Sequence, residues 1–167
     1  GKTLAADGNN LVTNPEFTTD TTGWTATAAT VTRRDYTASP DIDPTGGADN
    51  FGLEVNNDGT NGSAYQDRTL IVGVTYTLSG RAYSPSANTQ LNAARLSLGA
   101  TTETGASTTG EDAWETLSLS KAVDIAACRI KLYVTGSTGT DLAQWDAVSL
   151  QATLAMATHD LGRARLG

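Results

Sequence analysis

Short segments in which apolar and polar residues alternate recur along the chain, separated by clusters of Gly, Asn, Asp and Pro. A period of two predicts strands that bury one face, and the clusters predict turns. The expected strands, eight or nine in number, lie at 10–14, 25–37, 51–58, 63–72, 74–85, 89–100, 113–123, 128–136 and 142–151. This spacing is typical of a β-sandwich or barrel.

The connections are predicted from their turn residues. Gly73 separates segments 63–72 and 74–85, which we expect to pair as a hairpin. The Gly- and Thr-rich segment 101–112 is interpreted as a loop. Only the end of the chain, from about Ala152 to Leu166, could be helical, with Leu154, Met156 and Leu161 as its loosely spaced apolar residues.

Composition supports an all-β chain with a single domain. The 167 residues are 38% hydrophobic and include 17 Gly, and Thr is abundant. The net charge of −7, with a pI near 4.5, argues against a nucleic-acid partner. No apolar run approaches the ~20 residues of a membrane span, and no signal segment opens the chain. We therefore expect neither nucleic acid nor membrane as a partner.

The sequence carries none of the catalytic motifs that mark common enzyme classes. It has no G-x-S-x-G, no H-E-x-x-H and no phosphate loop, and His159 is its sole histidine. Paired carboxylates for glycoside hydrolysis remain open, since acids are plentiful, but none lies in a recognisable motif. The single Cys128 begins an expected strand, which predicts a buried and inert thiol. We predict a protein that is not an enzyme.

Four motifs occur in an order that is more specific than the strand pattern. They are "NLVTNPEF…GW" at 10–24, "LIVGVTYTLSGRAY" at 70–83, "DAWETLSLSKAV" at 112–123 and "LAQWDAVSLQ" at 142–151. Together they resemble the jelly-roll carbohydrate-binding modules of the group that binds xylan and β-glucan. The resemblance implies two antiparallel sheets, one of them concave, and no catalytic machinery. Similar domains also occur in tail and capsid-surface proteins of bacteriophages.

The aromatic residues of these motifs are interpreted first as core residues. By the resemblance, Phe17, Trp24, Trp114 and Trp145 match positions that pack beneath the sheets. Burying such rings stabilises a fold by several kcal/mol each, at ~25 cal/mol per Å². They therefore identify the fold and say little about a ligand.

A glycan site is predicted on the polar face of the expected strands. Sugar binding needs flat rings against which a pyranose can stack, and polar side chains that reach its hydroxyl groups. The candidate residues are Arg81, Tyr83, Arg95, Lys131 and Tyr133, with Gln66 and Arg68 on a neighbouring strand. The alternative is a solvated outer face, on which Thr, Arg and Tyr are common.

The resemblance also implies a structural Ca²⁺ between the first and last strands. Asp146 occupies the final-strand ligand position, but Thr18 stands where an acid would follow Phe17. Glu16 or Asp20 could substitute, because hard oxygen ligands suit the ion. The alternative is an Asp146 that makes ordinary hydrogen bonds to a turn. A second acidic segment, with Asp41, Asp43 and Asp49, lacks EF-hand spacing and is interpreted as a solvated loop.

We predict a jelly roll at 10–151 between two short arms, 1–9 and 152–167. The C-terminal arm carries Arg163 and Arg165, a small basic cluster on an acidic protein, and is either a frayed tail or a docking arm. The preferred function is a structural protein of a bacteriophage virion surface, such as a capsid decoration or tail component. Its arms would contact other virion proteins or copies of itself, and a cell-surface glycan is a further possible ligand. The alternative is a carbohydrate-binding module of a polysaccharide-degrading enzyme or an extracellular adhesin.

Overall fold

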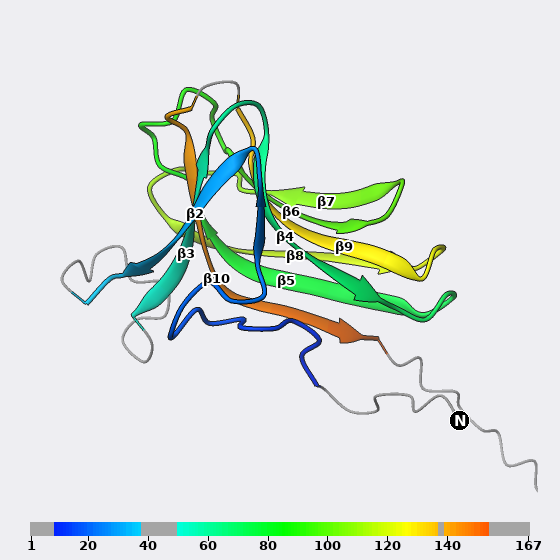
Figure 1. The fold of residues 1–167 in the computed structure, drawn as a ribbon. Coiled ribbons are helices and arrows are strands. Elements are labelled where there is room, and N and C mark those ends of the chain that lie inside the picture. The colour runs from blue at the N-terminus through cyan, green and yellow to red at the C-terminus, as the bar shows by residue number, and fades with distance from the viewer. Residues whose placement is uncertain (1–8, 38–49, 137–138, 154–167) are drawn as a thin grey trace, which may run out of the picture.

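The computed structural model describes residues 9–37, 50–136 and 139–153, and these residues form ten β-strands and no helix (Figure 1). The strands are β1 (Thr25–Thr27), β2 (Ala29–Asp35), β3 (Phe51–Asn57), β4 (Gly62–Thr69), β5 (Thr75–Tyr83), β6 (Ala94–Gly99), β7 (Glu103–Ser107), β8 (Trp114–Ala122), β9 (Ala127–Val134) and β10 (Leu142–Ala152). Within this described part, no helix could cross a membrane.

The strands form two five-stranded sheets. The first sheet has the order β1-β4-β9-β6-β7, and the second has the order β2-β3-β10-β5-β8 (Figure 1). Every pairing within them is antiparallel. The predicted all-β jelly-roll sandwich of two antiparallel sheets is confirmed.

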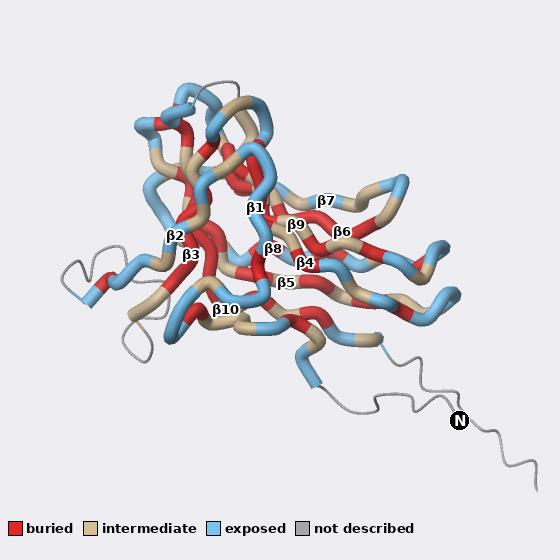
Figure 2. The backbone as a smooth tube through the Cα atoms, in the orientation of Figure 1, coloured by how far each residue is buried: buried red, intermediate tan, exposed pale blue. Residues whose placement is uncertain are grey.

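The two sheets bury their facing sides as one apolar core. Along β5, buried residues alternate with half-buried ones, and the same alternation follows β9 (Figure 2). Leu78 of β5, Leu132 of β9 and Trp145 of β10 are completely buried. Burying a Leu side chain contributes about 1.5–3 kcal/mol relative to exposure, so this core holds both outer faces rigidly.

The segment before β1 packs against the core without forming a strand. Phe17 is completely buried, Trp24 is 8% exposed, and their ring centroids lie 5.8 Å apart. Both rings therefore belong to the core, as predicted. The expected strand at 10–14 is wrong, because Asn14 and Phe17 have φ angles of 49° and 52° that break an extended ladder.

Side chains and two isolated backbone hydrogen bonds to β10, from Leu11 N–H to the Leu150 carbonyl oxygen and from Val148 N–H to that of Pro15, hold this opening segment in place without a continuous ladder. Asn10 donates from Nδ2 to the carbonyl oxygen of Val148 and accepts from the backbone N–H of Leu150. On the other side, Gln66 bonds both the N–H and the carbonyl oxygen of Thr13. The segment thus lies between β10 of the second sheet and β4 of the first.

Two expectations about connectivity are corrected. Segments 63–72 and 74–85 do not form a hairpin, since β4 belongs to the first sheet and β5 to the second. The chain crosses between the sheets through Gly73, whose φ of 86° suits glycine. Segment 101–112 is not wholly a loop, because β7 pairs with β6 as an edge strand. Its Gly, Ala, Ser and Thr residues lack the alternation that marks a strand.

Several predictions fall on residues that the structure does not describe. The arms 1–9 and 152–167 lie outside the described residues apart from Asn9, Ala152 and Thr153, and β10 continues through Ala152. The acidic loop with Asp41, Asp43 and Asp49 and the basic pair Arg163 and Arg165 also lie outside them.

Candidate functional site

The five predicted glycan-binding residues do not share one face. Arg95 lies on β6, and Lys131 and Tyr133 lie on β9, all on the outer side of the first sheet. Arg81 and Tyr83 lie on β5, on the outer side of the second sheet. The prediction grouped these residues on one non-core face, but β5 belongs to the second sheet and β6 and β9 belong to the first.

The outer side of the first sheet gathers the larger polar set. We call it the β9 face and define it by Ser63, Tyr65 and Asp67 of β4, Arg95 and Ser97 of β6, Glu103 of β7, and Arg129, Lys131 and Tyr133 of β9. The strand registers place these side chains in cross-strand rows. Tyr65, Lys131 and Ser97 form the middle row of neighbours.

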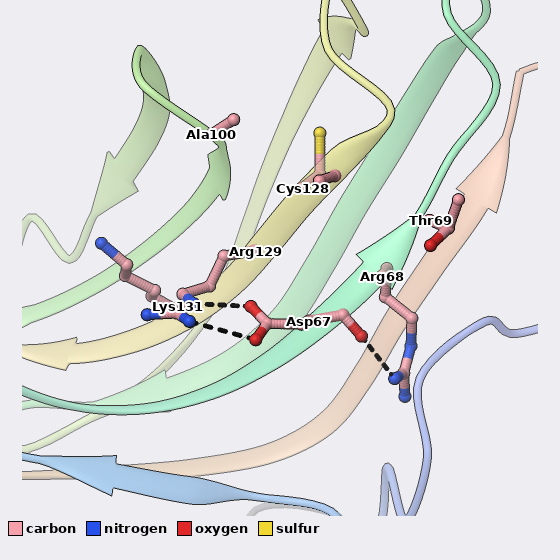
Figure 3. A pocket seen from close by; sticks show the side chains of 8 residues that line it. Asp67, Arg68, Thr69, Ala100, Cys128, Arg129 and Lys131 are labelled. Atoms are coloured by element: carbon pink, nitrogen blue, oxygen red, sulfur yellow. Dashed lines mark hydrogen bonds and ion pairs between the residues drawn. The ribbon is translucent and has the colours of Figure 1, made fainter.

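An ion pair anchors one end of the β9 face. Arg129 donates from Nε to Asp67 Oδ1 at 2.6 Å and from Nη2 to Oδ2 at 3.0 Å (Figure 3). The same guanidinium lies 3.7 Å above the centroid of the Tyr65 ring. The hydrogen bonds from Arg129 hold the pKa of Asp67 below its ordinary value, although burial opposes the shift. This bidentate pair fixes the orientation of all three side chains.

A second ion pair lies at the centre of the face. Lys131 bonds one carboxylate oxygen of Glu103, and its Nζ also lies 2.9 Å from the Tyr133 hydroxyl. Tyr133 donates to Glu103 Oε2 at 3.1 Å, and Ser97 donates to the same oxygen at 3.2 Å. Burial alone would raise the pKa of Glu103, but hydrogen bonds from Lys131, Tyr133 and Ser97 lower it overall.

The pKa of Lys131 moves in the complementary direction. Burial would lower it, but hydrogen bonds to Glu103 and Tyr133 raise it overall. Glu103 and Lys131 are therefore both charged at neutral pH. The hydrogen bonds of the Tyr133 hydroxyl to these two side chains hold the Tyr133 ring in one orientation.

Arg95 occupies the third part of the β9 face. Its guanidinium carbon lies 5.8 Å from the centroid of the Tyr133 ring. It also lies against β7 at Gly105, where an added Cβ would come within 2.5 Å of Arg95 Nε. Glycine at this position leaves room for the side chain to lie flat across the sheet.

Two hollows share Arg129 and Lys131 in their linings. The smaller, of about 290 Å³, is lined by Thr27, Asn61, Ser63, Tyr65, Arg95, Arg129, Lys131, Tyr133 and Thr135. The larger, of about 510 Å³, is lined by Asp67, Arg68, Thr69, Ala100, Ala127, Cys128, Arg129 and Lys131 (Figure 3). The larger hollow extends beyond the β9 face, because its lining includes Arg68 and Cys128, which face the opposite side of their strands.

The outer side of the second sheet is packed more closely. The Tyr83 ring lies 5.6 Å from that of Trp114, and Trp114 meets Tyr36 edge to face at 6.0 Å. Burial raises the pKa of Tyr83, whose hydroxyl points toward Asp112. Trp114 is therefore half-buried on an outer face, in a cluster with two tyrosines, and not beneath the sheets as predicted. Trp145 is in the core as predicted.

The strand pattern missed part of the site on β4. Tyr65 and Asp67 face outward, whereas Gln66 and Arg68, which were predicted there, face the opposite side and bond Thr13. The segment "SAYQDRT" has no apolar alternation, so its face could not be chosen, and a shift of one residue exchanges the two faces. Arg129 was not among the predicted site residues. Its spacing of two from Lys131 is the sequence signal that places it on the same face.

The two residues predicted to bind calcium lie in separate elements, β10 and the turn before Phe17. Asp146 is completely buried on β10 opposite Arg81, and Glu16 is half-buried in the turn before Phe17. Arg33 donates to the carbonyl oxygens of Phe17 and Thr18 at 2.7–3.1 Å, beside the position at which the resemblance implies an acidic ligand. The described residues include no group of three His, Cys, Asp or Glu able to hold a metal. Calcium binding at Asp146 and Glu16 stays a prediction.

Cys128 has the environment of a structural thiol. It is 2% exposed, its Sγ lies 3.1 Å from the carbonyl oxygen of Ile125, and burial raises its pKa. The predicted burial is confirmed, and a raised pKa disfavours the reactive thiolate.

No protein-family model matches the sequence, and no curated protein matches it significantly. The fold nevertheless occurs in two carbohydrate-binding modules of known structure. TmCBM61, solved with β-1,4-galactotriose, has a TM-score of 0.61 and 17% identity over 87% of this chain and 100% of that chain. The CBM22-1 xylan-binding domain of Xyn10C from Paenibacillus barcinonensis has a TM-score of 0.61 and 12% identity over 84% of this chain and 92% of that chain.

The fold also occurs in proteins of other kinds. The enzymatically active domain of tailspike protein 4 from bacteriophage CBA120 has a TM-score of 0.64 and 15% identity over 86% of this chain, which spans only 21% of that chain. The Stig cyclase Fisc from Fischerella sp. TAU has a TM-score of 0.69 and 13% identity over 87% of this chain and 98% of that chain. These similarities show a carbohydrate-binding-module-like jelly roll, and the fold alone does not assign a function.

Proposed function

We propose that the protein is a non-catalytic glycan-binding module whose ligand lies on the β9 face. The observation that carries this proposal is the pair of adjoining hollows lined by Tyr65, Tyr133 and side chains already held by two ion pairs. A binding site whose polar groups are fixed before the ligand arrives loses less entropy on binding.

The chemistry of this face suits a sugar. A tyrosine ring offers flat apolar surface to the C–H face of a pyranose, and Tyr133 lines the smaller hollow. Tyr65 lines it too, but Arg129 covers one face of the Tyr65 ring. The hydroxyl and amide groups of Ser63, Asn61 and Thr27 line the same hollow and can bond sugar hydroxyls. Support also comes from two structures with this fold that are described as bound to galactotriose and as xylan-binding.

We also propose that the protein is not an enzyme. This needs a separate argument, because the same fold occurs in a cyclase. Glycoside hydrolysis needs one carboxylic acid whose pKa is raised enough to donate a proton near neutral pH. The two acids of the β9 face, Asp67 and Glu103, have lowered pKa values and are each bonded to a cation. They suit hydrogen bonding to a ligand rather than proton transfer.

A matched pair of tyrosine substitutions tests the proposal. Tyr133→Ala removes a ring of the β9 face, and Tyr83→Ala removes a half-buried tyrosine from the outer side of the second sheet. On a glycan array followed by calorimetry, Tyr133→Ala should weaken binding by roughly 5- to 150-fold, because a stacked ring contributes about 1–3 kcal/mol. Tyr83→Ala should bind as the parent does. Loss of binding in Tyr83→Ala alone would move the site to the other sheet.

A virion-surface role is a second candidate, supported by the tailspike domain that shares the fold. In this setting the sandwich would present the β9 face to a cell-surface glycan, and the arms 1–9 and 152–167 would contact other virion proteins or a second copy of the chain. The alternative setting is extracellular, as a module of a polysaccharide-degrading enzyme or an adhesin. Both settings use the same binding face.

A further inference from the structure

The β9 face carries one more positive charge than negative, on a protein whose net charge is −7. Its cations are Arg95, Arg129 and Lys131, and its acids are Asp67 and Glu103. Asp67 pairs with Arg129, and Glu103 pairs with Lys131. The surplus charge on this face is therefore that of Arg95.

The guanidinium of Arg95 is held in position, but its hydrogen-bond donors are not used by the described part of the protein. Within the described part of the chain, Arg95 makes no hydrogen bond and no ion pair. Its guanidinium lies near the Tyr133 ring and passes close to the backbone at Gly105. It lines the smaller hollow, beside Tyr133 and Ser63. A guanidinium has five N–H donors, so this group offers a full hydrogen-bonding fork to a ligand.

An anionic group is the ligand that such a fork recognises best. Two parallel N–H groups match the two oxygens of a carboxylate or a sulfate, and charge assistance roughly doubles the strength of each hydrogen bond. A neutral sugar hydroxyl would use only part of this capacity. The negative charge on the rest of the protein would repel an anionic chain elsewhere and direct it to this face.

We propose that the β9 face binds an acidic glycan, with Arg95 bonding the carboxylate of a uronic or sialic acid, or a sulfate ester, in the smaller hollow. The adjacent sugar stacks on Tyr133, and the chain continues past Arg129 and Lys131 into the larger hollow. This inference rests on the proposed function, since it names the class of glycan for the same site.

The test uses paired ligands that differ only in charge. Oligosaccharides that contain uronate, sialate or sulfate are arrayed beside their carboxyl-reduced or desulfated counterparts. The full chain is then titrated with each oligosaccharide that binds on the array. The acidic member should bind at least tenfold more tightly than its neutral partner, and the preference should shrink as ionic strength rises. The acidic class that binds tells carboxylate from sulfate.

Substitutions at Arg95 then assign the preference to this side chain. Arg95→Met keeps an unbranched apolar stem and should lose roughly ten- to a hundredfold in affinity for the acidic ligand, as expected for a lost charge-assisted contact. Its affinity for the neutral partner should hold. Arg95→Lys should be intermediate, because it keeps the charge without the fork. Lys121→Met, on β8 of the other sheet, removes the same charge and should have no effect.

The outcomes separate this inference from the proposed function. Equal binding of acidic and neutral partners, weakened by Tyr133→Ala, overturns the role of Arg95 and leaves the glycan site in place. A preference for acidic ligands that survives Arg95→Met overturns the assignment to Arg95. Binding to no glycan at all overturns both proposals. A circular dichroism spectrum and melting temperature for each variant confirm that it is folded.

Discussion

Glu103 is the side chain on which the central part of the β9 face depends. Its carboxylate accepts from Lys131, Tyr133 and Ser97, so one residue of an edge strand orders three neighbours on β9 and β6. The side chains of Glu103 and Lys131 are 19% and 22% exposed, so water screens their attraction less than that of a surface pair. A ligand that reaches Tyr133 therefore meets a ring whose position Glu103 has set.

Glu103→Gln should lower the free energy of unfolding by about 1–2 kcal/mol at neutral pH, as expected for the loss of hydrogen bonds to a charged group. The folded pKa of Glu103 is lowered, so its stabilisation is present above the ordinary value of 4.5 and is lost as pH falls through the folded value. The pKa of Lys131 is raised, so its contribution is present below 10.5 and is lost as pH rises through the folded value.

Urea unfolding of the parent and Glu103→Gln from pH 3 to pH 9 measures this effect. The difference between them should be constant from about pH 5 upward and should shrink in more acidic solution. Asp124→Asn serves as the control, because Asp124 is exposed and makes none of the hydrogen bonds of this network. A difference that does not change with pH would show that Glu103 acts through packing and not through its charge.

Arg33 joins elements at the opposite edge of the molecule. From β2 its guanidinium reaches the carbonyl oxygens of Phe17 and Thr18, and it also lies 3.7 Å from the centroid of the Phe51 ring on β3. The turn that holds Phe17 in the core is thus tied to the second sheet by a positive charge. The resemblance seen in the sequence implies a calcium ion near this turn, which stays a prediction.

Arg33→Met should lower the free energy of unfolding by about 1–3 kcal/mol, because it removes charge-assisted hydrogen bonds to two carbonyl oxygens. Arg33→Lys should recover part of that loss. The parent protein should melt at the same temperature in EDTA and in millimolar Ca²⁺ if Arg33 supplies the charge at this turn. A melting temperature that rises with Ca²⁺ would instead support the predicted site at Asp146 and Glu16.

The whole molecule has two outer faces of different character. The second sheet covers part of its outer side with a cluster of Tyr36, Tyr83 and Trp114, and buries Asp146 completely. The first sheet leaves its polar side chains at the rim of two hollows. One face therefore suits packing, and the other suits recognition of a ligand.

The proposed contact between the C-terminal arm and a neighbouring subunit concerns the assembly of the whole molecule. If residues after Gln151 contact a neighbouring subunit, a protease should cut them readily in the dilute monomer and slowly in the assembled form. Light scattering over a range of protein concentrations identifies the two forms, and mass spectrometry locates the cuts. Equal protection of the tail in the isolated monomer would contradict a docking role.

The local pattern of the chain was enough to predict most strands and several core residues. Alternation in 74–85 and 128–136 placed Leu78 and Leu132 inward, since the period of a strand is a local property of the sequence. The four ordered motifs indicated the jelly roll through their resemblance to carbohydrate-binding modules. The same resemblance placed Phe17 and Trp145 in the core correctly and Trp114 wrongly.

Only the tertiary structure decided which strands share a sheet. Pairing between β4 and β9, or between β5 and β10, joins residues far apart in sequence and depends on the packing of the whole core. The candidate site was therefore divided, with Lys131 and Tyr133 on one face and Arg81 and Tyr83 on the other. Tyr65 was also assigned to the site only from the structure. In a polar strand the sequence does not indicate which side chains face outward, so the face of Tyr65 follows only from its pairing with Lys131.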